Sequence, residues 1–261
     1  MSAMPSPPPP VDRSLLEAAV DIAREAGEAT RRWFRAADLA VDSKADGTPV
    51  TAADRAAERL VRERIAERFP GDGVLGEEEP ETTGDSGRRW IVDPIDGTKA
   101  FTRGVPLYST LLALDDEHGP AVGVIVLPAL EQAVYAGRGL GCWCDGEPAR
   151  VSDTPGLDGA YLMSSGYSHW ADEALLAVKH AGCQLRTWGD GYGYALVATG
   201  RADAVVDPTV EVYDVAAMAV ILAEAGGRFT NMEGIDGAAG GSGVATNGRI
   251  HDDLLAVLAG R

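Results

Sequence analysis

Between residues 89 and 137 the chain contains four short runs of β-forming residues, and two helical stretches precede them. Apolar residues recur at helical spacing over 15–34 and 51–69, and "PG" at positions 70 and 71 ends the second stretch. Turn residues such as "DDEHGP" separate the β-forming runs, which favours neighbouring antiparallel strands. The sequence therefore predicts an antiparallel sheet packed on two helices, with strands over 89–93, 108–114, 121–127 and 132–137.

The pattern changes after about residue 152, where helices and strands alternate. Glycines end most of the apolar helical runs, and short β-forming segments lie between them. The predicted helices cover 172–182, 192–200, 214–227 and 250–260, and the predicted strands cover 202–207, 227–231 and 241–247. Such alternation is typical of a layered α/β fold. We therefore expect a tail over 1–13, an α+β half over 14–151 and an α/β half over 152–261.

Composition excludes several classes of partner and location. Lys and Arg total 23 whereas Asp and Glu total 40, and the net charge of −17 would repel nucleic acids and anionic membranes. The three cysteines are too few and too irregular for a disulfide framework, so we expect reduced thiols in the cytoplasm. The opening "MSAMPSPPPP" has no signal-peptide pattern and is typical of a disordered polyproline-type tail.

The segment "WIVDPIDGTKAF", residues 90–101, ends an apolar strand with two aspartates, Asp93 and Asp96. Carboxylates this close repel each other unless a cation lies between them. The Ile95 carbonyl and the Thr98 hydroxyl add oxygen ligands of the kind that Mg²⁺ accepts, and "GEEEP" upstream adds Glu77. A plain turn after the strand would explain the aspartates alone, but the acidic run and the threonine favour a metal site.

Other candidate motifs are weaker. Asp54 lies three residues after a threonine, and Asp214 opens a predicted helix, so the residues alone favour helix-capping roles for both. The four histidines are scattered, and no HExxH, GxSxG or Walker sequence is present. Hydrolysis through zinc, a serine nucleophile or a P-loop is therefore not expected.

Taken together, "DGTPVTAADRAAE", "GEEEP", "WIVDPIDGTKAF" and "YDVAAMAVILAEAGG" resemble the inositol monophosphatase superfamily of Mg²⁺-dependent phosphomonoesterases. The resemblance extends over nearly the whole chain from about residue 14. Within the superfamily, "DGTKAFTRGVP", "RTWGDGYGYALVATG" and "GGSGVATNGRIHDDLL" are most similar to the histidinol-phosphate phosphatase branch. The resemblance implies a layered α-β-α-β-α sandwich, a homodimer, two or three Mg²⁺ ions with Mn²⁺ as a substitute, and inhibition by Li⁺.

The resemblance also implies roles for individual residues. Glu77, Asp93, the Ile95 carbonyl and Thr98 would hold the activating Mg²⁺, and Asp93, Asp96 and Asp214 would hold a second ion. Most of these ligands fall in the N-terminal half. Asp54 would pair with Thr98 to orient or deprotonate the attacking water, with Glu77 as the third catalytic residue. The N–H groups of Gly97 and Thr98 would face phosphate, beside Lys99.

Departures from the family pattern bear on the substrate. Tyr213 replaces a tryptophan, and Ala100 replaces the asparagine usual in the histidinol-phosphate branch. Asp207 stands where inositol phosphatases often carry a substrate-binding glutamate, and Asp190 replaces small polar residues. Acids at 190 and 207 suit a cationic amino alcohol better than a neutral polyol, although Asp190 could instead cap the following helix.

The expected function is hydrolysis of a small phosphate ester. The leading candidate is L-histidinol phosphate, cleaved to histidinol and phosphate in histidine biosynthesis. The alternative is an inositol-1-phosphate phosphatase, or one for another sugar or nucleoside phosphate. A third interpretation is a catalytically idle relative that buffers metal or binds a partner.

Overall fold

The structure is a computed structural model, and it describes residues 7–37, 39–43 and 49–260. The first six residues of the expected tail lie outside this part. Residues 7–10 are exposed and have no regular structure, but they are tied to the body of the protein. The Arg138 guanidinium donates to the Pro9 carbonyl at 2.9 Å, and Val11 is buried.

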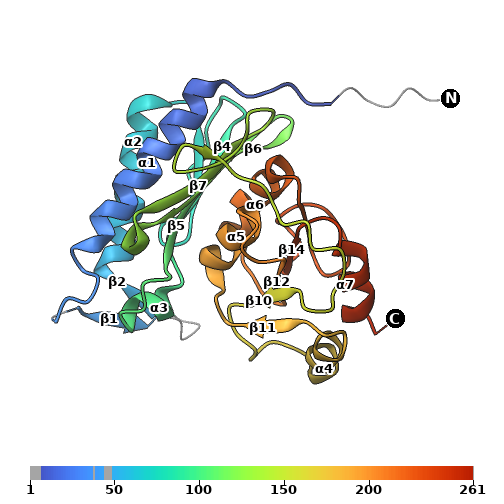
Figure 1. Cartoon of the computed structure of the whole chain (residues 1–261). Coiled ribbons are helices and arrows are strands. Elements are labelled where there is room, and N and C mark those ends of the chain that lie inside the picture. The colour runs from blue at the N-terminus through green and yellow to red at the C-terminus, as the bar shows by residue number, and fades with distance from the viewer. Residues whose placement is uncertain (1–6, 38, 44–48, 261) are drawn as a thin grey trace.

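Helices and sheets alternate in five layers (Figure 1). Helices α1 (Arg13–Arg31) and α2 (Ala52–Arg68) cover the outer face of a seven-stranded sheet. Helices α5 (Asp190–Ala198) and α6 (Val212–Ala225) lie between this sheet and a five-stranded one. Helices α4 (Asp172–His180) and α7 (His251–Leu258) cover the far side. The predicted α-β-α-β-α sandwich is confirmed.

The seven-stranded sheet follows chain order, β3-β4-β5-β6-β7-β8-β9, and only its β3–β4 pair is parallel. The four predicted strands are present in it as β4 to β7, and the prediction missed the short strands at the two ends of this order. Its members are β3 (Gly73–Gly76), β4 (Arg89–Asp96), β5 (Ser109–Asp116), β6 (Gly119–Leu127), β7 (Gln132–Gly137), β8 (Gly141–Cys144) and β9 (Glu147–Pro148).

The five-stranded sheet has the order β11-β10-β12-β14-β13, so it mixes parallel and antiparallel pairs. The sequence predicted β12 to β14 but not β10 or β11, because three-residue strands carry too little alternation to detect. Its members are β10 (Tyr161–Met163), β11 (Gln184–Arg186), β12 (Ala204–Asp207), β13 (Arg228–Thr230) and β14 (Gly243–Thr246). A separate hairpin pairs β1 (Val41–Ser43) with β2 (Pro49–Thr51).

Helix α6 lies at the centre of the molecule and is buried along most of its length. The largest apolar cluster joins Met218 and Ile221 of this helix to Leu111 and Ile125 of the seven-stranded sheet. The close approach requires Gly123 on β6, because a Cβ there would overlap the Ala217 carbonyl. The core therefore runs across residue 151, where we expected the two halves to divide.

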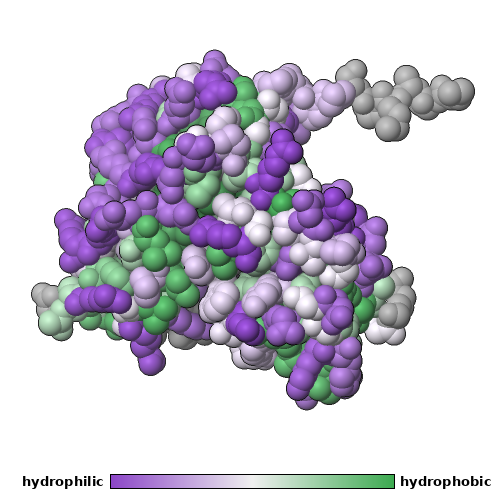
Figure 2. All heavy atoms as spheres, in the orientation of Figure 1, coloured by the Kyte–Doolittle hydropathy of each residue, from purple (hydrophilic) through white to green (hydrophobic). Residues whose placement is uncertain are grey.

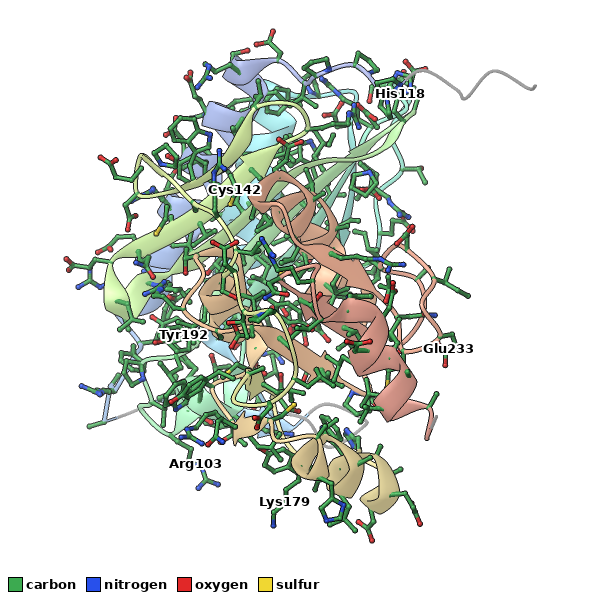
Figure 3. All side chains as sticks on the ribbon, turned by 45° about the vertical axis from the view of Figure 1, so that its right-hand side comes forward. Arg103, His118, Cys142, Lys179, Tyr192 and Glu233 are labelled. Atoms are coloured by element: carbon green, nitrogen blue, oxygen red, sulfur yellow. The ribbon has the colours of Figure 1, made fainter. Side chains whose placement is uncertain are left out.

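The surface agrees with the acidic composition. Figure 2 shows hydrophilic residues over most of the face that α1 and α2 form. In the described ranges no helix combines the length and apolar character that a membrane span needs. His118 lies in the exposed β5–β6 turn, at the opposite end of the molecule from Lys179 of α4 (Figure 3).

Candidate metal centre and active site

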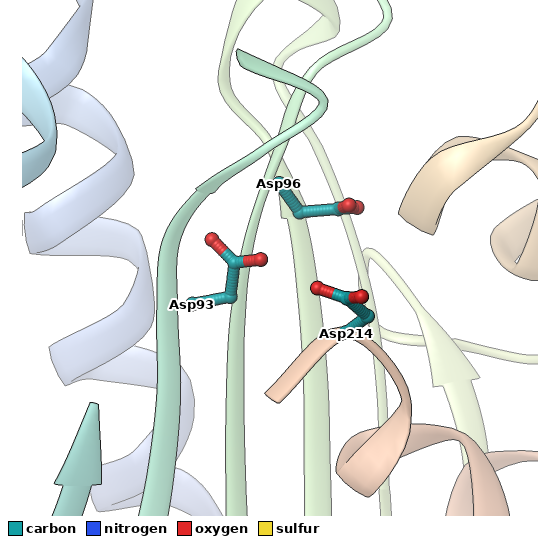
Figure 4. A group of neighbouring side chains, drawn as sticks. All are labelled: Asp93, Asp96 and Asp214. Atoms are coloured by element: carbon teal, nitrogen blue, oxygen red, sulfur yellow. The ribbon is translucent and has the colours of Figure 1, made fainter. Parts of the chain in front are cut away.

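The site forms where β4 ends. In a regular strand, residues 93 and 96 would point to opposite faces, because side chains alternate. The β4–β5 register shifts between Asp93 and Asp96, and a bulge of this kind re-aims side chains. The Thr110 hydroxyl fixes the irregular segment by donating to the Pro94 carbonyl at 2.8 Å. Both aspartates then project toward the N-terminus of α6 (Figure 4).

Asp214 in the first turn of α6 completes a cluster of three acids. Carboxylate oxygens of Asp93, Asp96 and Asp214 lie within 4.8 Å of one another. The Glu211 N–H donates to Asp214 Oδ2 at 2.8 Å, which confirms the capping role expected from the sequence. One carboxylate therefore caps the helix and also faces the other two acids (Figure 4).

Burial and mutual repulsion make these acids hard to ionise. The pKa of Asp93 is raised well above its usual value by burial, and then by Glu77, Asp96 and Asp214. Burial and neighbouring acids likewise raise the pKa of Asp96, and burial raises the pKa of Asp214 to about 6. Glu77 directly follows β3, whose last residue, Gly76, pairs with Val92 of β4, so Glu77 enters the site next to Asp93.

A divalent cation fits this donor set. Asp93 Oδ1 is buried and has no hydrogen-bond partner among the described residues. An unpaired buried oxygen costs free energy unless a ligand satisfies it. All the acids offer oxygen, the donor that Mg²⁺ prefers, and a cation would favour their ionised forms. The residues present therefore match a magnesium centre.

Asp54 and Thr98 lie at the side of the cluster. Asp54 Oδ2 accepts from the Thr51 N–H at 2.8 Å and from the Thr51 hydroxyl at 2.6 Å, and the predicted capping box is confirmed. The Thr98 hydroxyl lies 2.9 Å from the Ile95 carbonyl and 3.5 Å from Asp54 Oδ1. Asp54 therefore has one oxygen fixed by its own helix and the other facing Thr98.

Gly97 starts the short helix α3 (Thr98–Thr102) in a left-handed conformation, with φ of 79°. A Cβ at Gly97 would lie 2.9 Å from Asp190 Oδ2, so the Asp190 carboxylate lies directly over this turn. Asp190 is the first residue of α5 and makes no capping bond, because Gly189 is the N-cap. The capping interpretation of Asp190 was therefore wrong.

Asp190 is held by groups that the sequence did not point to. The Asp190 N–H donates to the Ser165 hydroxyl at 2.8 Å, and that hydroxyl lies 3.0 Å from Asp207 Oδ2. Asp207 is 4% exposed and also accepts from the Ser165 N–H and the Tyr194 hydroxyl. Gly191 likewise donates its N–H to Asp96, beside the Ser109 hydroxyl. Single serines and glycines give no specific sequence signal.

The remaining predicted residues surround the cluster. Lys99 is exposed on α3, and its charge opposes the rise in the pKa of Asp190, which burial and Asp207 bring to about 6. Tyr213 is half-buried beside the acids, and burial and then Glu77 raise its pKa. Ala100 is half-buried on α3.

Fold and site together define the class of protein: the chain belongs to the inositol monophosphatase family, whose model matches residues 12–260. A histidinol-phosphatase from Mycobacterium tuberculosis is 45% identical over 249 residues, which cover 92% of this chain and 96% of that protein. Another, from Chlorobaculum parvum, is 40% identical over 93% of this chain and 96% of its own length. The predicted family and its branch are confirmed.

The fold agrees with solved structures as well. The crystal structure of extragenic suppressor protein suhB from Bartonella henselae matches with a TM-score of 0.87 at 29% identity. The match covers 94% of this chain and 98% of that one.

Proposed function

We propose that this protein is a Mg²⁺-dependent phosphomonoesterase that hydrolyses L-histidinol phosphate to histidinol and phosphate. The observation that carries the proposal is that a cluster of three acids and a separate carboxylate lie side by side at one turn. The cluster of Asp93, Asp96 and Asp214 suits metal ions, and the Asp190 carboxylate lies over Gly97 beside it. The histidinol-phosphatases among its relatives support the same assignment.

Glu77, Asp93, Asp96, Asp214 and the Ile95 carbonyl would hold the metal, as two or three Mg²⁺ ions or as Mn²⁺. When bound, the ions polarise the phosphoryl group and lower the pKa of the attacking water. Competition by Li⁺ at this acidic site is part of the proposal.

The chain itself supplies the proton path. The single hydrogen of the Thr98 hydroxyl has two acceptors, the Ile95 carbonyl at 2.9 Å and Asp54 Oδ1 at 3.5 Å. Because the Ile95 carbonyl would hold metal, the hydroxyl would then donate to Asp54 and accept a hydrogen bond from the attacking water. Asp54 is suited to receive the proton, because its other oxygen is fixed by Thr51. The N–H groups of Gly97 and Thr98 would orient phosphate oxygens, and Lys99 would add a positive charge at the entrance.

Substrate choice follows from charge. Histidinol phosphate carries an amine and an imidazole, and an acid facing the bound ester would attract both. The approach of the Asp190 carboxylate to Gly97 supports this contact, whereas Asp207 is buried and would act on Asp190 through Ser165. We therefore retain Asp190 as a direct substrate contact and treat Asp207 as its support.

Hydrolysis of inositol-1-phosphate, or of another sugar or nucleoside phosphate, is the alternative. Ala100 favours it, because the histidinol-phosphate branch usually has asparagine there. A panel of esters scored by kcat/KM with Mg²⁺ present separates the two. The proposal predicts a preference for histidinol phosphate. A preference for inositol-1-phosphate would replace it, and no phosphate release from any ester would favour the idle relative.

The variant Asp190→Asn sharpens this test. It removes the charge and keeps the shape, so we expect kcat/KM for histidinol phosphate to fall by about 30-fold or more, as for loss of one partner of a buried charge pair. Hydrolysis of inositol-1-phosphate should change little, since that ester has no cation. An equal loss on both esters would show that Asp190 does not read substrate charge.

We further propose a cytoplasmic homodimer. The exposed side chains of Tyr161, Leu176 and Trp188 come from β10, α4 and the segment after β11, and β11 is an edge strand. Arg186 stacks over Tyr161 and Trp188, so a second copy would meet a preformed aromatic surface.

All three cysteines are free thiols, which suits a reducing compartment. Sedimentation equilibrium checks the dimer, and Trp188→Ala should shift it toward monomer.

A further inference from the structure

A buried carboxylate on α2 has no place in the chemistry described so far. Glu58 is 0% exposed, although an acid is rarely buried this fully without partners. Its oxygens accept from two successive backbone groups, the Glu78 N–H at 2.7 Å and the Glu79 N–H at 3.1 Å. Both donors belong to the acidic run that directly follows β3.

Arg62, one helical turn further along α2, closes the arrangement. Its Nε donates to Glu58 Oε1 at 2.9 Å, and its Nη2 donates to the Glu79 carbonyl at 3.0 Å. Gly76 packs directly against the same carboxylate, because a Cβ at this position would overlap the Glu58 side chain. The Glu58–Arg62 ion pair on α2 therefore binds the backbone after Glu77 on both sides: Glu58 accepts from its N–H groups, and Arg62 donates to its carbonyl.

The gripped segment carries Glu77 to the acid cluster. Gly76, the last residue of β3, pairs with Val92 of β4, so Glu77 follows directly beside Asp93. The Glu77 carboxylate and the acids of β4 carry like charges, so their repulsion would push the loop away from β4 unless other contacts hold it. The Glu58 carboxylate accepts from the backbone N–H groups one and two residues after Glu77, so it holds the chain immediately beyond that residue.

We propose that Glu58 is a positioning residue for the metal centre: with Arg62 it fixes the backbone after β3, so that Glu77 is held in place before any cation binds. The inference rests on the proposed metal-binding role of Glu77. This role differs from a purely structural one. A contact that only joins α2 to the sheet would change the free energy of unfolding, but the folded protein would keep its metal affinity.

The test is isothermal titration calorimetry of the full chain with Mg²⁺ alone, for Glu58→Gln and its parent. The amide keeps the shape but loses an acceptor for one of the two N–H groups and the charge that pairs with Arg62. We expect the Mg²⁺ dissociation constant to rise about 10–100-fold, the usual effect of losing an outer partner of a metal ligand. At saturating Mg²⁺, kcat should return close to the parent value.

The matched control is Glu63→Gln, the same chemical change on the exposed face of α2, which should leave Mg²⁺ affinity unchanged. If Glu58→Gln does not fold, Arg62→Lys tests the same grip. That variant keeps the charge but lacks the rigid fork that joins Glu58 to the Glu79 carbonyl, so the same loss of affinity is expected. A folded variant at either position with parental Mg²⁺ affinity would overturn the inference.

Glu77→Gln separates this inference from the function on which it rests. If Glu77→Gln weakens Mg²⁺ binding and the folded Glu58 and Arg62 variants do not, the positioning role is wrong and the metal site stands. If Glu77→Gln also binds Mg²⁺ as the parent does, Glu77 is not a ligand and the proposed centre itself fails.

Discussion

Asp96 shows how one side chain can be held for two purposes. Its carboxylate is 7% exposed, and the Ser109 hydroxyl and the Gly191 N–H both donate to Oδ2. These two bonds fix the carboxylate while it faces Asp93 and Asp214. The residue is therefore oriented by neutral donors from β5 and α5, and its charge is available to a cation.

The first prediction concerns this charge. In Asp96→Asn, the amide oxygen can still accept from Ser109 and Gly191, so the fold should survive. Mg²⁺-dependent turnover should fall by about 100-fold or more, because a metal in such a site contributes several kcal/mol. Steady-state phosphate release and circular dichroism check both parts. Asp253→Asn, an exposed acid on α7, is the control, and near-parental turnover in Asp96→Asn would contradict the metal role.

At the scale of single residues, the sequence was most informative for the acids. Asp93 and Asp96 were recognisable because two carboxylates end one apolar strand. Ser165 was not, since its importance comes from a hydroxyl between Asp207 and the Asp190 N–H, and no pattern in the chain links those three positions.

At the scale of elements, the helices were predicted well because their apolar spacing extends over several turns. Helix α2 matches its prediction to within a residue at each end, whereas α1 ends at Arg31 instead of continuing to residue 34. Short strands such as β10 and β11 were missed. The bulge in β4 was also missed, although it is the feature that turns Asp93 and Asp96 to one side.

Helix α7 begins with a buried histidine that carries the second prediction. His251 bonds through both ring nitrogens to Thr230 and Thr246, at 3.0 and 2.9 Å, and burial lowers its pKa to about 4. In the unfolded chain the His251 ring binds a proton below about pH 6.5, whereas the folded protein does so only at lower pH. The contribution of neutral His251 to the free energy of unfolding is therefore complete above about pH 6.5. It is lost as the pH falls from about 6.5 to 4, by about 2 kcal/mol.

Urea unfolding at pH 7.5 and pH 5 measures this contribution. His251→Gln cannot take up the proton, so its free energy of unfolding should change less between the two pH values than that of the parent. His118→Gln, at an exposed turn, should keep the parental pH dependence. An unchanged pH dependence in His251→Gln would show that another group is responsible.

At the scale of the whole molecule, the site exists only because the two sheets share the central layer of α5 and α6. Asp214 comes from α6 and Asp190 from α5, whereas Asp93 and Asp96 come from β4. The order of motifs along the chain predicted the family, and hence the layers. The contact of Asp190 with Gly97 could not be predicted, because it depends on how α5 packs against the other sheet.

The third prediction tests this packing. Gly123→Ala places a methyl group against the Ala217 carbonyl, so α6 must move away from β6. Overpacking of this kind should lower the free energy of unfolding by about 1–3 kcal/mol. Because Asp214 moves with α6, Mg²⁺ affinity should fall as well. Gly156→Ala, where no atom lies within 4 Å of the added carbon, should change neither quantity. Loss of stability with unchanged Mg²⁺ affinity would show that the position of α6 does not control the metal site.

The proposed chemistry requires the buried acids at the end of β4 and the start of α6 to bind divalent metal. The most direct measurement is an anomalous difference map from a crystal of the full chain grown with Mn²⁺, which replaces Mg²⁺ and scatters anomalously. We expect a peak bounded by carboxylate oxygens of Asp93, Asp96 and Asp214. A map with no peak there, and with the three side chains turned away from one another, would contradict it.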